Sequence, residues 1–137
     1  MSVEDQKKNV IQYYWNQAVE SLESAEREFN ARSFNFAVNR TYYAAFYAVT
    51  AALLDRNLKF VKHSGVKAAF HKELIKTGLL ERKWSIVYDR LFEDRQQSDY
   101  VALVSFEPDF IKEQITLCCE LLDVIRLLIA SLNDEKK

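Results

Sequence analysis

The sequence predicts an all-α protein, an up-and-down helical bundle of four to five helices. Apolar residues recur at spacings of three and four through most of the chain, as on the buried face of a helix. The 137 residues include only two glycines and one proline, too few for the many turns of a sheet protein. A composition that is 49% hydrophobic can form one core at this length. We therefore expect a single domain over residues 1–137, frayed at 1–8 and 133–137.

Composition also bounds the surroundings of the protein. No apolar run reaches the length of a membrane span, and the first residues lack the apolar segment of a signal peptide. Cys118 and Cys119 are adjacent in a helical pattern, and no second cysteine pair completes a metal site. We expect a cytoplasmic protein without a membrane partner, a structural metal or a cofactor, and with both cysteines reduced.

The first two helices are predicted over residues 5–30 and 34–55. The first has an amphipathic pattern, and Ser33 is a candidate N-cap for the second. Between Phe34 and Asp55 the second helix carries one charge, that of Arg40. A helix that is apolar on every side is usually central, so we expect it to form the spine of the bundle.

Arg40 is the first candidate site residue. At 100° per residue it shares one face with Phe36, Tyr43 and Tyr47. A buried guanidinium needs a carboxylate, a phosphate or a route to solvent, because an unpaired buried charge is costly. Arg40, Tyr43 and Tyr47 are therefore candidate ligand-binding residues, and a structural ion pair of Arg40 is the alternative.

The third helix is predicted over residues 64–77, with Ser64 as N-cap and Gly78 as its stop. His63 then lies just before a helix N-terminus, where it could contact an anion or remain an exposed or capping group. The segment from Arg56 to Lys83 has eight lysines and arginines against two glutamates. Such a segment attracts phosphate or an acidic partner, or it forms a solvated helical face.

The fourth helix is predicted over residues 81–98, and its apolar stripe continues to Arg95. The stripe consists of Trp84, Val87, Tyr88 and Leu91. Arg95 should therefore point inward or along a groove, as a catalytic group, a ligand contact or a buried strut. Glu93 and Asp94 fall on other faces and are poor internal partners, whereas Asp99 could pair with Arg95 four residues on.

The fifth helix is predicted to begin after Ser105 as N-cap, with Pro108 in its first turn, and to end near residue 132. It carries two adjacent apolar stripes. One runs through Ile111, Ile115, Cys118, Leu122, Ile125 and Ile129, and the other through Leu117, Leu121, Val124 and Leu128. Two stripes exceed what one neighbouring helix covers, so the pattern favours a homodimer interface.

Three short motifs carry a family resemblance: NRTYYAAFYA at 39–48, KHSGV at 62–66 and RQQSDY at 95–100. In this order and spacing the chain resembles the HEPN domains of bacteria and archaea, over nearly its whole length. The resemblance implies a four- or five-helix up-and-down bundle, commonly a homodimer. It also implies a toxin and antitoxin context, with a small nucleotidyltransferase-fold protein as partner.

Many HEPN domains are ribonucleases that cut RNA without metal, and their signature is an arginine followed after four to six residues by a histidine. In that chemistry the histidine takes a proton from the ribose 2′-OH, and the arginine stabilises charge on the attacked phosphate. Here Arg95 fits the arginine position, but Asp99 and Tyr100 stand where the histidine is expected. Residues 96–110 contain no histidine.

Two functions follow. In the favoured one, a groove lined by Arg95, Asp99, Tyr100 and Arg40 binds nucleotide, RNA or a nucleotidyltransferase-fold partner. In the alternative, the protein is a metal-independent endoribonuclease toxin that uses Arg95 for the phosphate and Asp99, Tyr100 or His63 for proton transfer. A purely structural polar cluster of Arg40, Arg95 and Asp99 is the third interpretation.

Overall fold

The computed structural model describes residues 2–98 and 106–134. In chain order its elements are α1 (Val3–Asn30), α2 (Phe34–Asp55), α3 (His63–Ala69), the π-helical segment η1 (Phe70–Ile75), α4 (Lys83–Ser98), α5 (Pro108–Leu128) and α6 (Ala130–Asp134). The described residues form no strand. The predicted all-α fold is therefore confirmed.

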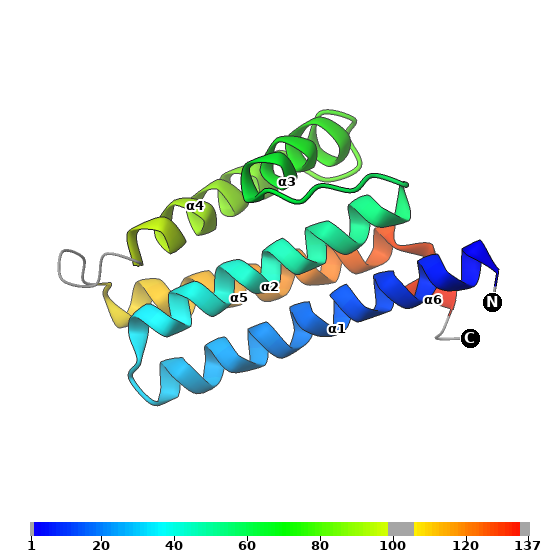
Figure 1. The fold of residues 1–137 in the computed structure, drawn as a ribbon. Helices are drawn as coiled ribbons and strands as arrows, with labels where there is room; N and C mark the ends of the chain where they lie inside the picture. The colour runs from blue at the N-terminus through cyan, green and yellow to red at the C-terminus, as the bar shows by residue number, and fades with distance from the viewer. Residues whose placement is uncertain (1, 99–105, 135–137) are drawn as a thin grey trace.

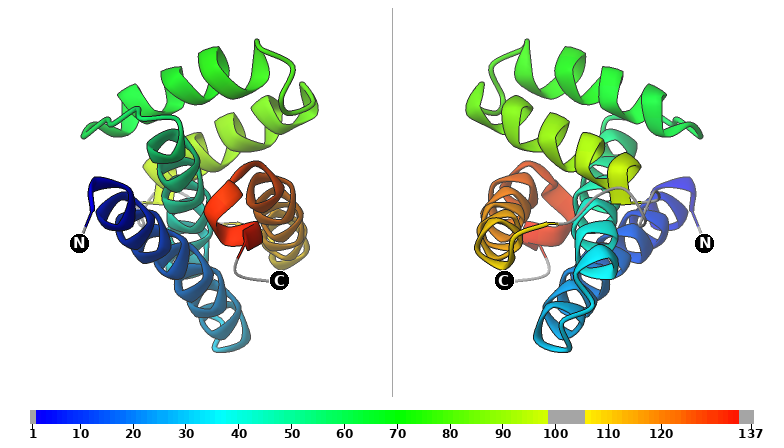
Figure 2. Two further views of the ribbon diagram at one scale, coloured as in Figure 1. Left: turned by 90° about the vertical axis from the view of Figure 1, so that its right-hand side faces the viewer. Right: turned by 90° about the vertical axis from the view of Figure 1, so that its left-hand side faces the viewer.

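The central helix is α2, as predicted. Figure 1 shows α1, α2 and α5 running side by side, with α3 and α4 on one side of this group. The end-on views in Figure 2 show α1 and α5 on different sides of α2, and α4 crossing close to it. Helix α2 contacts each of α1, α3, η1, α4 and α5. Any side chain that leaves α2 toward α3 and α4 therefore meets residues from two other helices.

The first two helices begin close to the predicted positions. Helix α1 begins at Val3, because Ser2 acts as its N-cap and its Oγ accepts a hydrogen bond from the Asp5 backbone N–H at 3.1 Å. Ser33 occupies the N-cap position of α2, but its side chain makes no capping hydrogen bond. None of the described helices is both long and apolar enough to cross a membrane.

The third helix departs from the prediction at its start. The N-cap is Lys62 rather than Ser64, because the Val66 N–H already donates to the Lys62 carbonyl at 3.1 Å. His63 is therefore the first residue of α3 and not part of the loop before it. Gly78 follows η1 with a φ of 83°, a left-handed conformation that favours glycine, so it ends the segment as predicted.

The last helix is interrupted. Helix α5 ends at Leu128 and not near residue 132, because Ile129 adopts an extended conformation before α6. Glu107 occupies its N-cap position, and Ser105 lies outside the described residues.

The second apolar stripe of α5 is largely covered within one copy of the chain. Leu121 is fully buried, and the other stripe residues, Leu117, Val124 and Leu128, are half-buried. Contacts from α1, α2, α4 and α6 provide this cover. These contacts do not test the homodimer, which stays a prediction.

Candidate functional site

Arg95 lies in the last turn of α4 and points toward α2. Its Cζ is 5.8 Å from the centre of the Tyr42 ring and 5.6 Å from that of Tyr43. Its Nη2 donates a hydrogen bond to the Tyr43 hydroxyl at 3.3 Å. Trp84, Tyr88 and Leu91 on the same stripe are buried, and Arg95 itself is half-buried. Helical spacing therefore positions the guanidinium, as the stripe predicts.

His63 reaches the same face of α2 from the beginning of α3. Its ring stacks on Phe46 with a centroid distance of 4.3 Å and an interplanar angle of 11°. A hydrogen bond of 2.8 Å joins His63 Nδ1 and the Tyr42 hydroxyl. The imidazole also meets the Tyr43 ring edge-on at 5.6 Å. Histidine and arginine therefore contact the same two tyrosines.

We call this group the aromatic site; it consists of Tyr42, Tyr43, Phe46, His63 and Arg95. Three helices contribute to it: α2 supplies the rings, α3 the imidazole and α4 the guanidinium. Part of the ligand-binding set predicted from sequence, Tyr43 and His63, is thereby brought together with Arg95. Sequence reasoning missed Tyr42, although it stands beside Tyr43 in the YY pair of the motif.

Burial and charge set the protonation states of the site. Burial, and then the positive charge of Arg95, lower the pKa of His63 below its usual 6.5. Burial raises the pKa of Tyr42 to about 12. At neutral pH the imidazole is neutral and the phenol is protonated. The hydrogen bond between the Tyr42 hydroxyl and His63 Nδ1 then has two possible directions, because a neutral imidazole carries its proton on either Nδ1 or Nε2.

Arg40 adds a second guanidinium next to the aromatic site. Its Cζ lies 5.0 Å from the centre of the Tyr43 ring, so Tyr43 contacts both arginines. Its Nε and Nη2 donate to Oδ1 of Asn39 at 3.1 and 2.6 Å. Within residues 2–98 and 106–134 no carboxylate lies at ion-pair distance from Arg40. A buried Arg40 was expected to need a carboxylate, a phosphate or a route to solvent. The carboxylate is therefore not found among the described residues.

Tyr47 continues the row of rings toward α1. Its ring lies 5.8 Å from that of Tyr43 and stacks at 6.2 Å on Tyr14 of α1. With Arg40 it lines a hollow of about 240 Å³ between α1 and α2. Burial raises its pKa, so the phenol stays protonated at neutral pH. Tyr47 thus borders the aromatic site on the α1 side.

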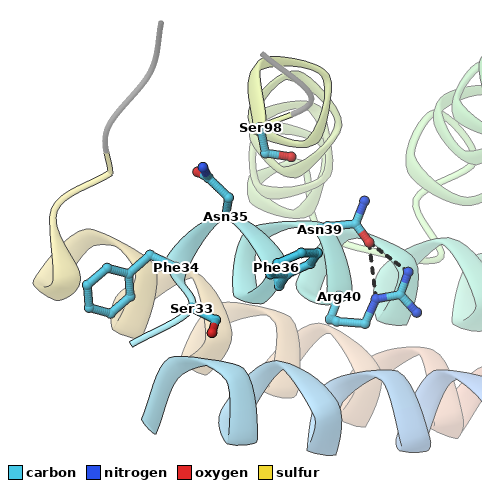
Figure 3. A pocket seen from close by; sticks show the side chains of 7 residues that line it. All are labelled: Ser33, Phe34, Asn35, Phe36, Asn39, Arg40 and Ser98. Carbon is cyan, nitrogen blue, oxygen red and sulfur yellow. Dashed lines mark hydrogen bonds between the residues drawn. The ribbon is translucent and has the colours of Figure 1, made fainter. Parts of the chain in front are cut away.

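A larger hollow, of about 610 Å³, opens at the N-terminal end of α2 (Figure 3). Its lining consists of Ser33, Phe34, Asn35, Phe36, Asn39, Arg40 and Ser98. We call it the α2 hollow. Arg40 belongs both to this hollow and to the surroundings of Tyr43, so the hollow and the aromatic site adjoin.

Asp94 is buried, although it lies off the apolar stripe of α4. Its exposed fraction is 7%, and it lines a small cavity with Thr41 of α2 and Gln114 of α5. Burial raises its pKa to about 6, which the charge of Arg90 at 3.9 Å only partly opposes. Its burial comes from α5, which covers this side of α4, and the periodicity of α4 alone does not reveal this cover.

Two predicted site residues, Asp99 and Tyr100, lie outside the described residues. In the part of the chain that the structure describes, no group of three His, Cys, Asp or Glu side chains is placed to hold a metal ion.

Fold and site together define a helical-bundle protein with arginine, histidine and tyrosine side chains gathered on one face of its central helix. The HEPN domain model matches residues 11–128, and the chain belongs to this family. A Thermotoga maritima protein named "UPF0332 protein" is 41% identical over 129 residues, which cover 94% of this chain and 98% of the relative.

Two Methanocaldococcus jannaschii proteins that are similar to this chain carry the name "Putative toxin". One is 38% identical over 92 residues, which cover 67% of this chain and 63% of the relative. The other is 32% identical over 83 residues, which cover 61% and 62%. The chain thus spans less than two thirds of each of these two relatives. Both names are consistent with the toxin context that the resemblance implied.

Proposed function

We propose that this HEPN protein belongs to a toxin module and binds the phosphodiester backbone of RNA at the aromatic site and Arg40. The observation that carries the proposal is the placement of two guanidinium groups against one ring. Arg40 and Arg95 lie 5.0 and 5.6 Å from the centre of Tyr43. Guanidinium groups bind phosphate oxygens through charge-assisted hydrogen bonds, and two of them against one ring suit a chain of phosphates.

The other groups of the site suit the same ligand. We further propose that neutral His63 carries its proton on Nε2, where it offers a hydrogen-bond donor to a phosphate oxygen. The half-buried rings of Tyr43 and Phe46 offer surfaces on which an unpaired base can stack. Because the contacts are to phosphate, affinity should decrease steeply as salt rises.

Binding without rapid cleavage follows from the protonation states. A general base for the ribose 2′-OH needs a free lone pair. In the proposed tautomer, with the proton on Nε2, the His63 lone pair on Nδ1 accepts the hydrogen bond from Tyr42. With a pKa of about 12, Tyr42 itself remains protonated at neutral pH. We therefore expect slow cleavage or none.

A second candidate function is a metal-independent endoribonuclease, because a neutral histidine lies close to Arg95. If Nδ1–H donated to the Tyr42 oxygen instead, Nε2 would carry the free lone pair and could accept the 2′-OH proton. Arg95 would then stabilise the charge on the attacked phosphate. This enzyme would depend on His63 as strictly as on Arg95.

The test is retention of a labelled single-stranded RNA with divalent metals chelated. The wild-type chain should retain RNA at low salt and lose it as salt rises, and the RNA should stay intact. Arg95→Ala should abolish retention, whereas Arg82→Ala, an exposed arginine outside the site, should not. Rapid cutting that needs both Arg95 and His63 would select the endoribonuclease. No retention at low salt would overturn RNA binding.

The toxin module has its own test. Expression of the wild-type chain alone should slow growth, and Arg95→Ala should remove the effect. We further propose a nucleotidyltransferase-fold protein as the partner and a homodimer as the working form. A pull-down with such a protein tests the partner, and failure to capture it would reject this proposal. Light scattering at micromolar concentration tests the homodimer, and a monomer mass would reject it.

A further inference from the structure

Phe36 places an aromatic ring in solvent beside Arg40. Its exposed fraction is 67%, although most rings on α2 are buried or half-buried. The ring lies on the wall of the α2 hollow, one helical turn before Arg40 (Figure 3). Exposure of a large apolar ring is unfavourable in water, and a flat ligand stacked on the ring would remove this cost.

Two amide side chains, those of Asn35 and Asn39, line the same hollow as the ring. Asn39 Oδ1 accepts both hydrogen bonds from Arg40, so the amide NH₂ is turned away from the guanidinium (Figure 3). The two N–H donors of this amide are thereby left for another acceptor. Asn35 lines the hollow as well and adds a second amide. Proteins recognise unpaired bases by stacking them on an aromatic ring and by hydrogen bonds to the base edge, and the hollow offers a ring and amide groups for both.

We propose that the α2 hollow binds one unpaired base of an RNA strand. Phe36 is the stacking surface, the Asn39 amide donates to an acceptor on the base edge, and Arg40 contacts the adjoining phosphate. The proposal rests on the proposed function, because it places this nucleotide next to the phosphate held at Arg95. A volume of about 610 Å³ is in the range of small-molecule pockets and suits one nucleotide.

Continuity of the two sites favours a strand over a free mononucleotide. Arg40 lies both in the hollow and against Tyr43, and Tyr43 accepts the hydrogen bond from Arg95. One phosphate at Arg40 and another at Arg95 would thus belong to consecutive nucleotides. A mononucleotide could fill the hollow, but it would not engage Arg95.

The experiment compares two ligands of equal length and charge, a short single-stranded RNA and the same ribose-phosphate chain without bases. Phe36→Ala should weaken RNA binding roughly 5- to 150-fold, the range for loss of one base–aromatic stack, and leave the abasic chain unaffected. Phe36→Trp should retain RNA binding. Ile86→Ala, which changes a side chain of equal exposure on α4, should alter the affinity for neither ligand.

Each outcome separates this inference from the proposed function. Arg95→Ala should weaken both ligands, because it removes a phosphate contact. If it does so while Phe36→Ala changes nothing, the base-binding hollow is rejected and phosphate binding stands. If neither variant has an effect, both proposals fail. A third outcome is that AMP binds as tightly as RNA, and that its binding depends on Phe36 but not on Arg95. The ligand of the hollow would then be a mononucleotide and not an RNA strand.

A protein contact at Phe36 would also overturn the proposal. Light scattering of wild type and Phe36→Ala should give the same mass if the ring serves RNA. A lower mass for the variant would assign Phe36 to an interface between two copies of the chain, and its effect on RNA would then be indirect.

Discussion

Two sides of the same helix, α2, have opposite characters. One side is lined by fully or almost fully buried alanines, namely Ala44, Ala45, Ala48, Ala51 and Ala52. The neighbouring α5 approaches closely enough for Cys118 Sγ to donate to the Thr41 carbonyl at 3.4 Å. The other side presents Tyr42, Tyr43 and Phe46 to α3 and α4. Small side chains permit close packing, and large rings keep the helices further apart.

The contrast explains why the candidate site lies on only one side. Close packing against alanines leaves no space for a long polar side chain such as arginine, and Cys118 is fully buried there, which raises the pKa of its thiol. On the aromatic side, rings with polar tips leave room for Arg95 and His63. We expect changes on the alanine side to affect stability and changes on the aromatic side to affect binding.

The largest effect should come from the core behind the alanine side. Ile125 of α5 is fully buried, so Ile125→Ala should lower the free energy of unfolding by about 2 to 5 kcal/mol through a cavity. Leu127, two residues on, is 73% exposed, and Leu127→Ala should change the free energy of unfolding by less than about 0.5 kcal/mol. Urea denaturation of both variants measures the difference; equal losses would contradict this packing of α5.

Overpacking of the alanine side should have the next largest effect. Ala45 is fully buried, and Ala45→Leu should cost about 1 to 3 kcal/mol because α5 cannot move away without strain. Ala68→Leu, at an exposed position of α3, is the matched control and should be nearly neutral. If Ala45→Leu is tolerated equally well, the helices are not in close contact at this position.

Asp94 tests the junction between the two sides through pH. Its pKa is about 6 in the folded protein and near 3.8 when unfolded, so its stabilising contribution is complete below pH 3.8 and lost as pH rises through 6. Asp94→Asn cannot ionise and should be more stable than wild type by about 1 to 3 kcal/mol at pH 8, but not at pH 4. Denaturation at both pH values checks this, with the exposed Asp123→Asn as control. A pH-independent difference would contradict it.

The smallest effect on stability should come from Arg95 itself. Arg95→Ala should change the free energy of unfolding by less than about 1 kcal/mol, whereas Leu91→Ala on the same stripe should cost about 2 to 5 kcal/mol. Equal losses would make Arg95 a structural strut.

The same variant should also raise the pKa of His63, because a nearby positive charge is removed. An NMR titration of the imidazole measures this shift, and Arg82→Ala should leave the titration unchanged. An unaltered pKa in Arg95→Ala would mean that the two groups do not interact.

The sequence by itself determined the local features. Periodicity located the helices and predicted that Arg95 points inward or along a groove, because a side chain's direction on a regular helix depends only on its position. The nearly charge-free segment 34–55 predicted that α2 is the central helix, because a helix that is apolar on every side is usually surrounded by others. Motif order was enough to indicate the family, which the match over residues 11–128 shows.

Only the tertiary structure decided which of these residues meet. His63 reaches Tyr42 and Phe46 after an irregular connection, and no sequence periodicity describes the path of such a segment. The burial of Asp94 could not be predicted from α4 alone, because it depends on α5, a helix from another part of the chain. The direction of a side chain is set by its own helix, but its partners are set by how separate helices pack, which requires the whole fold.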